Sequence, residues 1–142
     1  MYVENWKRDR WLETKSKTTD VVKLPSGLMY KVLLPRFFGR SAVPKSNCVC
    51  HYKGELYSGK IFDSSYEIGK PITCSPNDAI KGLSEALQLM KEGEKWELYI
   101  PSDLAYGNEG YGEIIPPDCP LQFTIELLKV EGEYKNLSSS SK

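Results

Sequence analysis

The chain has 142 residues, of which 40% are hydrophobic and 27% are charged. That length and apolar content suit one domain with a sizeable core, which excludes an intrinsically disordered chain. Its 19 basic and 19 acidic side chains cancel in formal charge, so neither a nucleic acid nor an anionic membrane is expected as a partner.

Residues 1–24 are charged and polar and are expected to form an accessory arm or a short helix. The large apolar side chains Trp6 and Trp11 belong to no continuous helical stripe, which favours an arm resting on the body. Charged residues exclude a signal-peptide core here, and no later apolar run has the length of a membrane span. The chain as written is therefore expected to be cytoplasmic, and secreted or periplasmic only if its N-terminus was trimmed.

Residues 25–131 carry the pattern of one domain rich in strands. A turn at residues 25–27 precedes an expected strand over residues 28–34. Residues 47–57 alternate in polarity, and a further strand is expected to continue after the turn that follows them.

The cysteines are expected to be reduced thiols, because four are too few for the disulfide framework of a small secreted scaffold. Structural zinc needs four ligands, which the Cys48-x-Cys50-His51 run does not supply. Cys48 and Cys50 are instead expected on the strand face that Tyr52 shares, with His51 opposite and without a Ser or Cys partner arranged as a triad. Neither a metal nor a cofactor is expected.

One helix is expected after the capping sequence Ser75-Pro76-Asn77-Asp78. Its buried stripe is Ile80, Leu83, Leu87 and Met90, and a glycine ends it. Two alternating strands are expected after it, over residues 94–100 and 121–130. A helix covering an antiparallel sheet indicates an α+β fold, and residues 132–142 should form a disordered Ser-rich tail.

The loop over residues 102–120 is too long and too apolar to be a simple connection. Bulky side chains such as Tyr106 and Tyr111 alternate with glycines that allow tight turns. The loop is therefore expected to line a concave apolar wall.

Residues 26–130 resemble the FKBP-type peptidyl-prolyl isomerases, most of all the macrophage infectivity potentiator branch. The resemblance is carried by Ser26-Gly27-Leu28-x-Tyr30-Lys31-Val32-Leu33, Tyr52-x-Gly54, Gly59-Lys60-x-Phe62-Asp63-Ser64-Ser65, Ala86-Leu87-Gln88-Leu89-Met90, Ile100-Pro101-Ser102-Asp103-Leu104-Ala105-Tyr106-Gly107, Ile114-Ile115-Pro116-Pro117 and Phe123-x-Ile125-Glu126-Leu127-Leu128. It implies a twisted antiparallel half-barrel sheet wrapped around one short helix, with a site between them.

The resemblance also implies which residues form that site. The expected catalytic set is Tyr52, Phe62, Asp63, Tyr106 and Phe123, with Asp63 as the only acid. The expected ligand-binding set is Ile72, Ala79, Ile80, Leu83, Tyr111, Ile114 and Ile115. By analogy with the family, the Tyr106 hydroxyl and the Ile80 backbone N–H would hold carbonyl oxygens.

Such a site suits cis/trans rotation about the bond before proline. Resonance holds that bond planar with a barrier of roughly 18 to 20 kcal/mol, and resonance is lost in the twisted transition state. A dry apolar pocket would favour the twisted form and needs no nucleophile or metal. Proline-containing peptides and folding proteins are the expected substrates, with macrolides such as tacrolimus and rapamycin as inhibitors.

The sequence departs from the family pattern at four positions. Leu83 replaces the usual tryptophan of the pocket floor, Ile72 and Cys74 stand where aromatics are common, and Ile68 replaces an arginine of some members. The loss of the indole leaves a second function open, a binding module or co-chaperone with weak or no catalysis. A third possibility is that the N-terminal arm docks onto a partner, although a monomer is expected.

Overall fold

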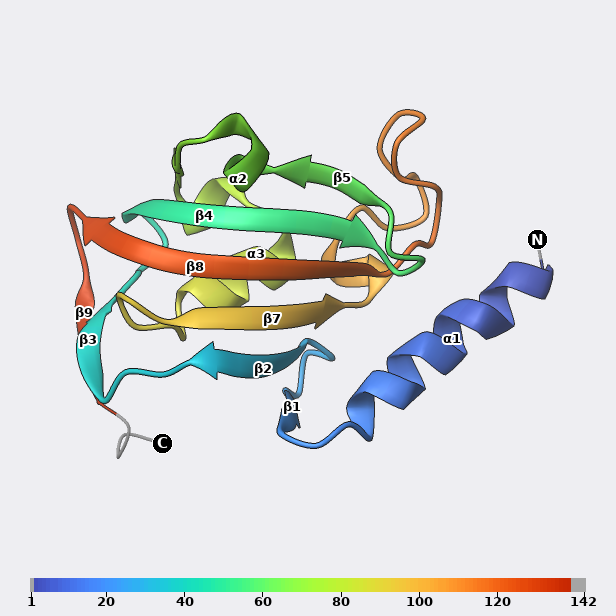
Figure 1. Cartoon of the computed structure of the whole chain (residues 1–142), viewed down its shortest axis with the longest axis horizontal. Coiled ribbons are helices and arrows are strands. Elements are labelled where there is room, and N and C mark those ends of the chain that lie inside the picture. The colour runs from blue at the N-terminus through green and yellow to red at the C-terminus, as the bar shows by residue number, and fades with distance from the viewer. Residues whose placement is uncertain (1, 139–142) are drawn as a thin grey trace.

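The computed structural model describes the backbone of residues 2–138 and the side chains of residues 6–137. A twisted antiparallel sheet of seven strands carries helix α3 (Lys81–Leu87) on one face (Figure 1). The strands, from one edge of the sheet, are β1 (Val21–Lys23), β2 (Met29–Leu34), β7 (Lys95–Ile100), β8 (Leu121–Glu131), β4 (Asn47–Leu56) and β5 (Ile61–Ser64), with β6 (Ile72–Cys74) also paired to β4. The predicted α+β fold is confirmed.

The core lies between α3 and the sheet, and the alternating residues of the long strands build it. Leu121, Phe123, Ile125 and Leu127 of β8 are each at most 3% exposed, as their period of two predicts. Leu87 of α3 is fully buried against this layer. The hydrophobic pattern therefore sets which face of each strand meets the helix.

The start of α3 differs from the sequence-based expectation. Pro76–Asp78 form a separate 3-10 turn, η1, whose backbone hydrogen bonds run from Asp78 and Ala79 back to Ser75 and Pro76. Ala79 and Ile80 are then extended, so α3 begins at Lys81. No side chain of the predicted capping sequence caps either element, and the Ser75 hydroxyl instead donates a hydrogen bond to the Pro44 carbonyl oxygen.

The chain end also differs from expectation. Within residues 132–142, for which the sequence predicts disorder, Lys135–Ser138 form strand β9 and pair with β3 (Phe38–Ser41), while residues 139–142 lie outside the described part. The Arg40 guanidinium lies 4.4 Å from the centroid of the Tyr134 ring beside this pair. Backbone pairing and a cation–π contact hold a polar strand that shows no apolar alternation.

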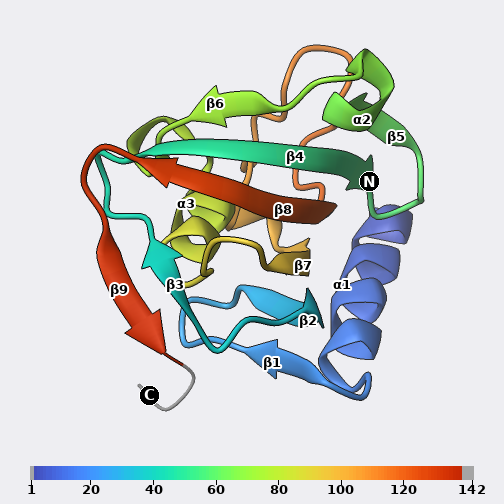
Figure 2. The same ribbon diagram turned by 60° about the vertical axis from the view of Figure 1, so that its left-hand side comes forward.

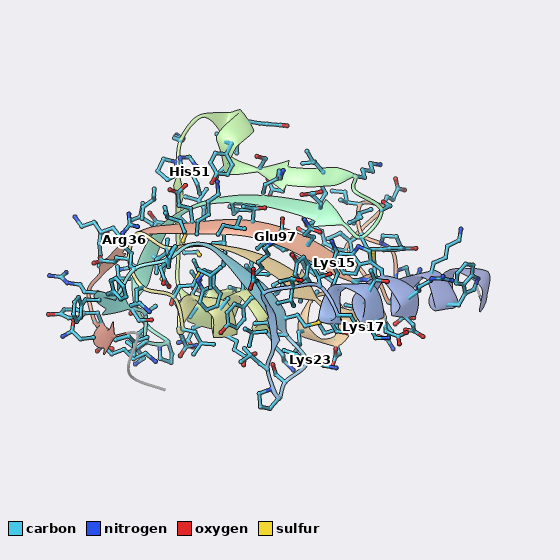
Figure 3. All side chains as sticks on the ribbon, turned by 60° about the horizontal axis from the view of Figure 1, so that its bottom comes forward. Lys15, Lys17, Lys23, Arg36, His51 and Glu97 are labelled. Atoms are coloured by element: carbon cyan, nitrogen blue, oxygen red, sulfur yellow. The ribbon has the colours of Figure 1, made fainter. Side chains whose placement is uncertain are left out.

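The N-terminal segment forms helix α1 (Tyr2–Ser16) where an arm was favoured. The helix projects past the sheet (Figure 1), and Trp11 meets it edge-on, with its ring centroid 6.2 Å from that of Tyr57 and 6.0 Å from that of Tyr99. Lys15, labelled in Figure 3, lies with its Nζ 5.0 Å from the centre of the Tyr99 ring. Helix α1 is thus anchored by one aromatic side chain, Trp11, and not by the continuous apolar stripe with which a helix usually packs against a sheet.

Strand β1 follows α1 and pairs with β2, so the sheet begins at Val21 rather than at residue 25 (Figure 2). Helix α2 (Ser65–Ile68) follows β5 and lies close to β4. None of the helices within residues 2–138 is long and apolar enough to cross a membrane.

Candidate functional site

A cavity of about 330 Å³ lies between α3 and the sheet. Four strands, η1, α3 and the loop after β7 contribute to it. Its lining residues are Cys50, Tyr52, Phe62, Asp63, Ile72, Cys74, Asp78, Ala79, Ile80, Leu83, Leu87, Tyr106, Phe123 and Ile125. Nine of the twelve site residues predicted from the sequence are therefore brought together around one hollow.

Two phenylalanine rings form one wall of this cavity. The rings of Phe62 and Phe123 meet edge to face, with centroids 5.7 Å apart and planes at 82°, and Tyr52 lies 6.1 Å from Phe123. Gly54 makes this close approach possible, because a Cβ at that position would stand 2.7 Å from Cζ of Phe62. The wall is thus an aromatic corner.

The floor of the cavity is aliphatic. Leu83 lines it as predicted, together with three residues that the sequence-based site did not include, Cys50, Leu87 and Ile125. Each of the three shares a face with a predicted residue, two positions from Tyr52 or Phe123 on a strand or four positions from Leu83 on the helix. That periodicity is the signal that could have found them.

Asp63 is not the only acid at the cavity, because Asp78 of η1 also lines it. The expectation of a single acid was wrong, since the unpredicted break between η1 and α3 turns this part of the chain toward the hollow. Cys74, noted in the sequence only as a departure from the family, lines the cavity from β6.

The rim carries a tyrosine–carboxylate pair. The Tyr52 hydroxyl donates a hydrogen bond to Oδ2 of Asp63. Burial, and then this hydrogen bond to the carboxylate, raise the pKa of Tyr52 above its ordinary value. The pair therefore keeps the phenol protonated and fixes its ring against Phe123.

Two donors at the cavity remain available for a ligand. Burial raises the pKa of Tyr106, with smaller contributions from Tyr111 and Asp63, so the Tyr106 hydroxyl keeps its proton. Among the described residues, none accepts a hydrogen bond from the Tyr106 hydroxyl or from the Ile80 backbone N–H. Both groups could therefore hold carbonyl oxygens of a bound peptide.

Three predicted site residues lie outside the cavity. Ile115 is only 1% exposed and anchors the loop in the core, whereas Tyr111 and Ile114 are 58% and 52% exposed. Paired backbone hydrogen bonds between Tyr111 and Ile115 close the loop, and a Cβ at Gly110, whose φ is +68°, would strike the Ile115 carbonyl oxygen. Only Tyr111 stays near the site, because its ring centroid is 5.2 Å from that of Tyr106.

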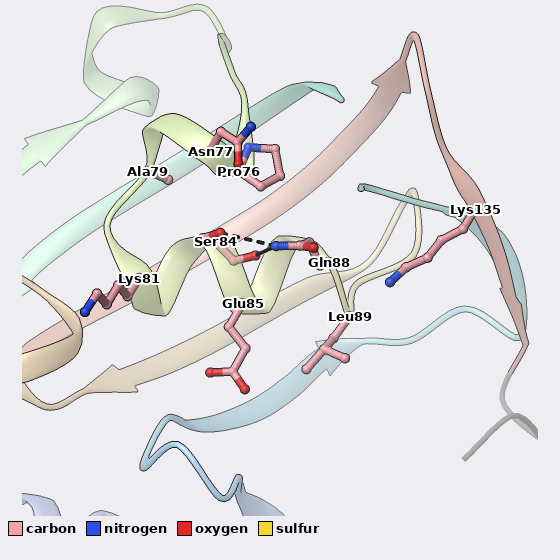
Figure 4. Close-up of a pocket in the computed structure, with 9 residues that line it drawn as sticks. All are labelled: Pro76, Asn77, Ala79, Lys81, Ser84, Glu85, Gln88, Leu89 and Lys135. Carbon is pink, nitrogen blue, oxygen red and sulfur yellow. Dashed lines mark hydrogen bonds between the residues drawn. The ribbon is translucent and has the colours of Figure 1, made fainter. Parts of the chain in front are cut away.

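A second hollow, of about 440 Å³, lies on the outer side of α3 (Figure 4). Charged and amide side chains dominate it: Lys81 and Glu85 come from the helix and Lys135 from β9, while Gln88 donates hydrogen bonds to Ser84. It has no aromatic wall to receive an apolar ring. The cavity between α3 and the sheet is therefore the better candidate site.

His51 has a serine neighbour, but the pair is structural. Its Nδ1 lies 2.8 Å from Oγ of Ser65, which is fully buried and accepts a hydrogen bond from the Tyr52 backbone N–H. The His51 ring also stacks on Tyr66 at 4.6 Å between centroids. These contacts tie α2 to β4, and the Ser65 hydroxyl that His51 meets is fully buried.

The lining of the cavity suits the binding and desolvation of an apolar group. Within residues 6–137, whose side chains the structure describes, no group of three or more His, Cys, Asp or Glu side chains could hold a metal ion. Aromatic and aliphatic side chains line most of the cavity, and its polar groups sit where they can receive an amide. Such a hollow suits an apolar ring attached to a peptide backbone.

The sequence of the chain is similar to those of known proteins. Residues 39–128 match a family described as FKBP-type peptidyl-prolyl cis-trans isomerase. The macrophage infectivity potentiator of Trypanosoma cruzi is 48% identical over 121 residues, which cover 85% of this chain and 62% of that protein. The FKBP-type 22 kDa peptidyl-prolyl cis-trans isomerase of Escherichia coli (strain K12) is 42% identical over 123 residues, covering 85% of this chain and 58% of that protein.

Solved structures agree with the sequence matches. The crystal structure of FkpA from Escherichia coli aligns with a TM-score of 0.83 at 36% identity, covering 89% of this chain and 58% of that one. A peptidyl-prolyl cis-trans isomerase from Pseudomonas syringae aligns with a TM-score of 0.82 at 36% identity, covering 89% of this chain and 92% of that one. The chain spans less than two thirds of the length of the two curated relatives named above.

Proposed function

The chain belongs to the FKBP-type peptidyl-prolyl cis-trans isomerase family, and on this basis we propose that it accelerates rotation about the bond before proline in peptides and folding proteins. The observation that carries the proposal is the aromatic corner of Phe62 and Phe123 beside two donors that have no hydrogen-bond acceptor in the described part of the chain. The corner would receive the proline ring, and the donors would hold the flanking carbonyl groups.

The catalytic effect follows from the transfer of the X-Pro amide out of water and into the cavity. A planar X-Pro amide is more polar than the twisted one, because resonance places negative charge on its carbonyl oxygen. Moving the amide from water into an apolar hollow destabilises the planar form more than the twisted form. The barrier of roughly 18 to 20 kcal/mol is thereby lowered without any covalent step.

The Tyr52–Asp63 pair supports binding rather than proton transfer. Rotation moves no proton, so Asp63 needs no general-acid role. Its carboxylate orients the Tyr52 hydroxyl and so fixes the ring beside Phe123. The same cavity could accept the pipecolyl-like ring of tacrolimus or rapamycin, which we propose as inhibitors.

A protease-coupled assay on an Ala-Leu-Pro-Phe peptide tests the proposal. Tyr106→Phe keeps the ring and removes one donor, and should lower kcat/KM roughly tenfold, because one hydrogen bond contributes about 1 kcal/mol or somewhat more. Tyr111→Phe removes a hydroxyl from the exposed loop tip and serves as the matched control. No acceleration by the unmodified protein above the uncatalysed rate would refute the proposed activity.

Leu83 favours a second candidate, a peptide-binding module with weak catalysis. An isobutyl group on the cavity floor offers a proline ring less flat surface than the indole usual in the family. Leu83→Trp should therefore raise turnover or tighten macrolide binding if the floor limits catalysis. Rapid turnover together with submicromolar tacrolimus binding by the unmodified protein would exclude the weaker function.

A further inference from the structure

Two thiols line the cavity and take no part in the proposed rotation. Cys50 of β4 is fully buried, whereas Cys74 of β6 is only half-buried and reaches the hollow from the side. Strands β4 and β6 pair in a register that sets Cys48 opposite Cys74, with Cys50 opposite Ile72. The pairing brings three thiols together, of which Cys50 and Cys74 line the cavity.

Among these thiols Cys74 has the environment of a nucleophile. A hydrogen bond with the Cys50 side chain lowers the pKa of Cys74, although burial and Asp78 oppose this effect. Burial raises the pKa of Cys48 to about 12, and the pKa of Cys50 is raised by the same hydrogen bond and by burial. Cys74 is thus the thiol that combines access to the cavity with a stabilised thiolate.

The fourth cysteine provides a contrast. Cys119 is 3% exposed and does not line the cavity, and its Sγ is 3.5 Å from the Pro120 carbonyl oxygen. A reagent can reach Cys119 only after a local opening of the structure. Reaction at Cys74 can therefore be separated from general thiol reactivity.

We propose that Cys74 is a covalent modification site for low-molecular-weight disulfides, and that the resulting mixed disulfide fills the hollow that would hold the proline ring. The Cys74 proton passes to solvent, and Sγ attacks one sulfur of the reagent. The S–S bond of the reagent breaks, and its other sulfur leaves as a thiolate with the electron pair. The reagent is the oxidant, Cys50 is a positioning residue, and the blocking effect rests on the proposed function.

The position of Cys74 makes the adduct inhibitory. Cys74 lines the same hollow as Phe62, Leu83 and Phe123, whose side chains would contact the proline ring. A group attached to its sulfur therefore takes up part of that hollow and competes with the ring for the aromatic corner. Thiol reductants should reverse the effect, because a mixed disulfide exchanges with free thiols.

The test uses dithiodipyridine with the full chain and follows the ultraviolet absorbance of the released thiopyridone. The folded protein should release one equivalent quickly, and the remaining thiols should react at least roughly tenfold more slowly because they are buried. Cys74→Ser should abolish the fast equivalent, while Cys119→Ser should keep it. Cys50→Ala should slow it roughly fivefold or more, because the thiolate loses its hydrogen-bond donor.

Peptide mass mapping and an activity assay complete the experiment. An adduct on Cys74, and loss of isomerase activity that dithiothreitol restores, are the expected results. A fast equivalent that survives in Cys74→Ser, a first adduct on Cys119, or full activity in the Cys74 adduct would each overturn the proposal. If the unmodified protein has no isomerase activity, the proposed function fails while fast labelling of Cys74 still supports the reactive site.

Discussion

Gly54 lies in β4 behind the aromatic corner, paired with Asp63 on one side and Phe123 on the other. Gly54→Ala would place a Cβ 2.7 Å from Cζ of Phe62 and 3.0 Å from Cε2 of Phe123, which is closer than packed atoms approach. Overpacking of this kind costs about 1 to 3 kcal/mol. Replacing a strand glycine recovers about 0.5 to 1 kcal/mol, which leaves a net loss of about 0.5 to 2 kcal/mol.

The larger expected effect of Gly54→Ala is on catalysis, because both rings must move out of the corner that receives proline. The urea midpoint should fall by about 0.25 to 1 M at a slope of about 2 kcal/mol/M, and kcat/KM should fall roughly tenfold. Gly82→Ala is the control, since its Cβ would stand 2.7 Å from Ile100 in the core and touch neither ring. Wild-type stability and activity in Gly54→Ala would refute this account of the wall.

Two further predictions concern stability. Glu94 is 3% exposed and accepts hydrogen bonds from the Arg36 and Lys91 backbone N–H groups. Glu94→Ala should therefore lower the free energy of unfolding by about 3 kcal/mol in urea titrations. An unchanged urea midpoint would contradict this. Burial raises the folded-state pKa of Tyr52 and Tyr99, so their stabilising contribution is present below about pH 10 and is lost as the pH rises through the folded-state pKa. Stability should therefore decline in alkali, and less steeply in Tyr99→Phe; equal slopes would argue against the assignment.

Strands buried on one face were readable from the sequence. Leu121, Phe123 and Ile125 alternate with polar residues, and the structure buries them as that alternation requires. Strand β9 could not be predicted from the sequence, because backbone pairing with β3 holds its polar residues and leaves no apolar alternation to indicate a strand. For the N-terminal segment the sequence left an arm and a short helix open and favoured the arm, since a single tryptophan anchors α1 and no apolar stripe was available to indicate it.

The site shows the same division. Side chains on strands and at α3 reach the cavity where family motifs and strand alternation placed them. Ile114 and Ile115 do not, because a loop closed by its own hydrogen bonds turns one outward and the other into the core. Asp78 was missed because nothing in the sequence distinguishes a 3-10 turn followed by an extended pair from a continuous helix.

The central claim is that a proline ring binds in the cavity between α3 and the sheet. NMR spectra of the labelled protein, recorded while an Ala-Leu-Pro-Phe peptide is added, test it most directly. Shifts should concentrate at Phe62, Ile80, Leu83 and Phe123, and the peptide's own cis and trans signals should exchange in the same samples. Shifts confined to the outer hollow around Gln88, with no exchange between the peptide isomers, would contradict the claim.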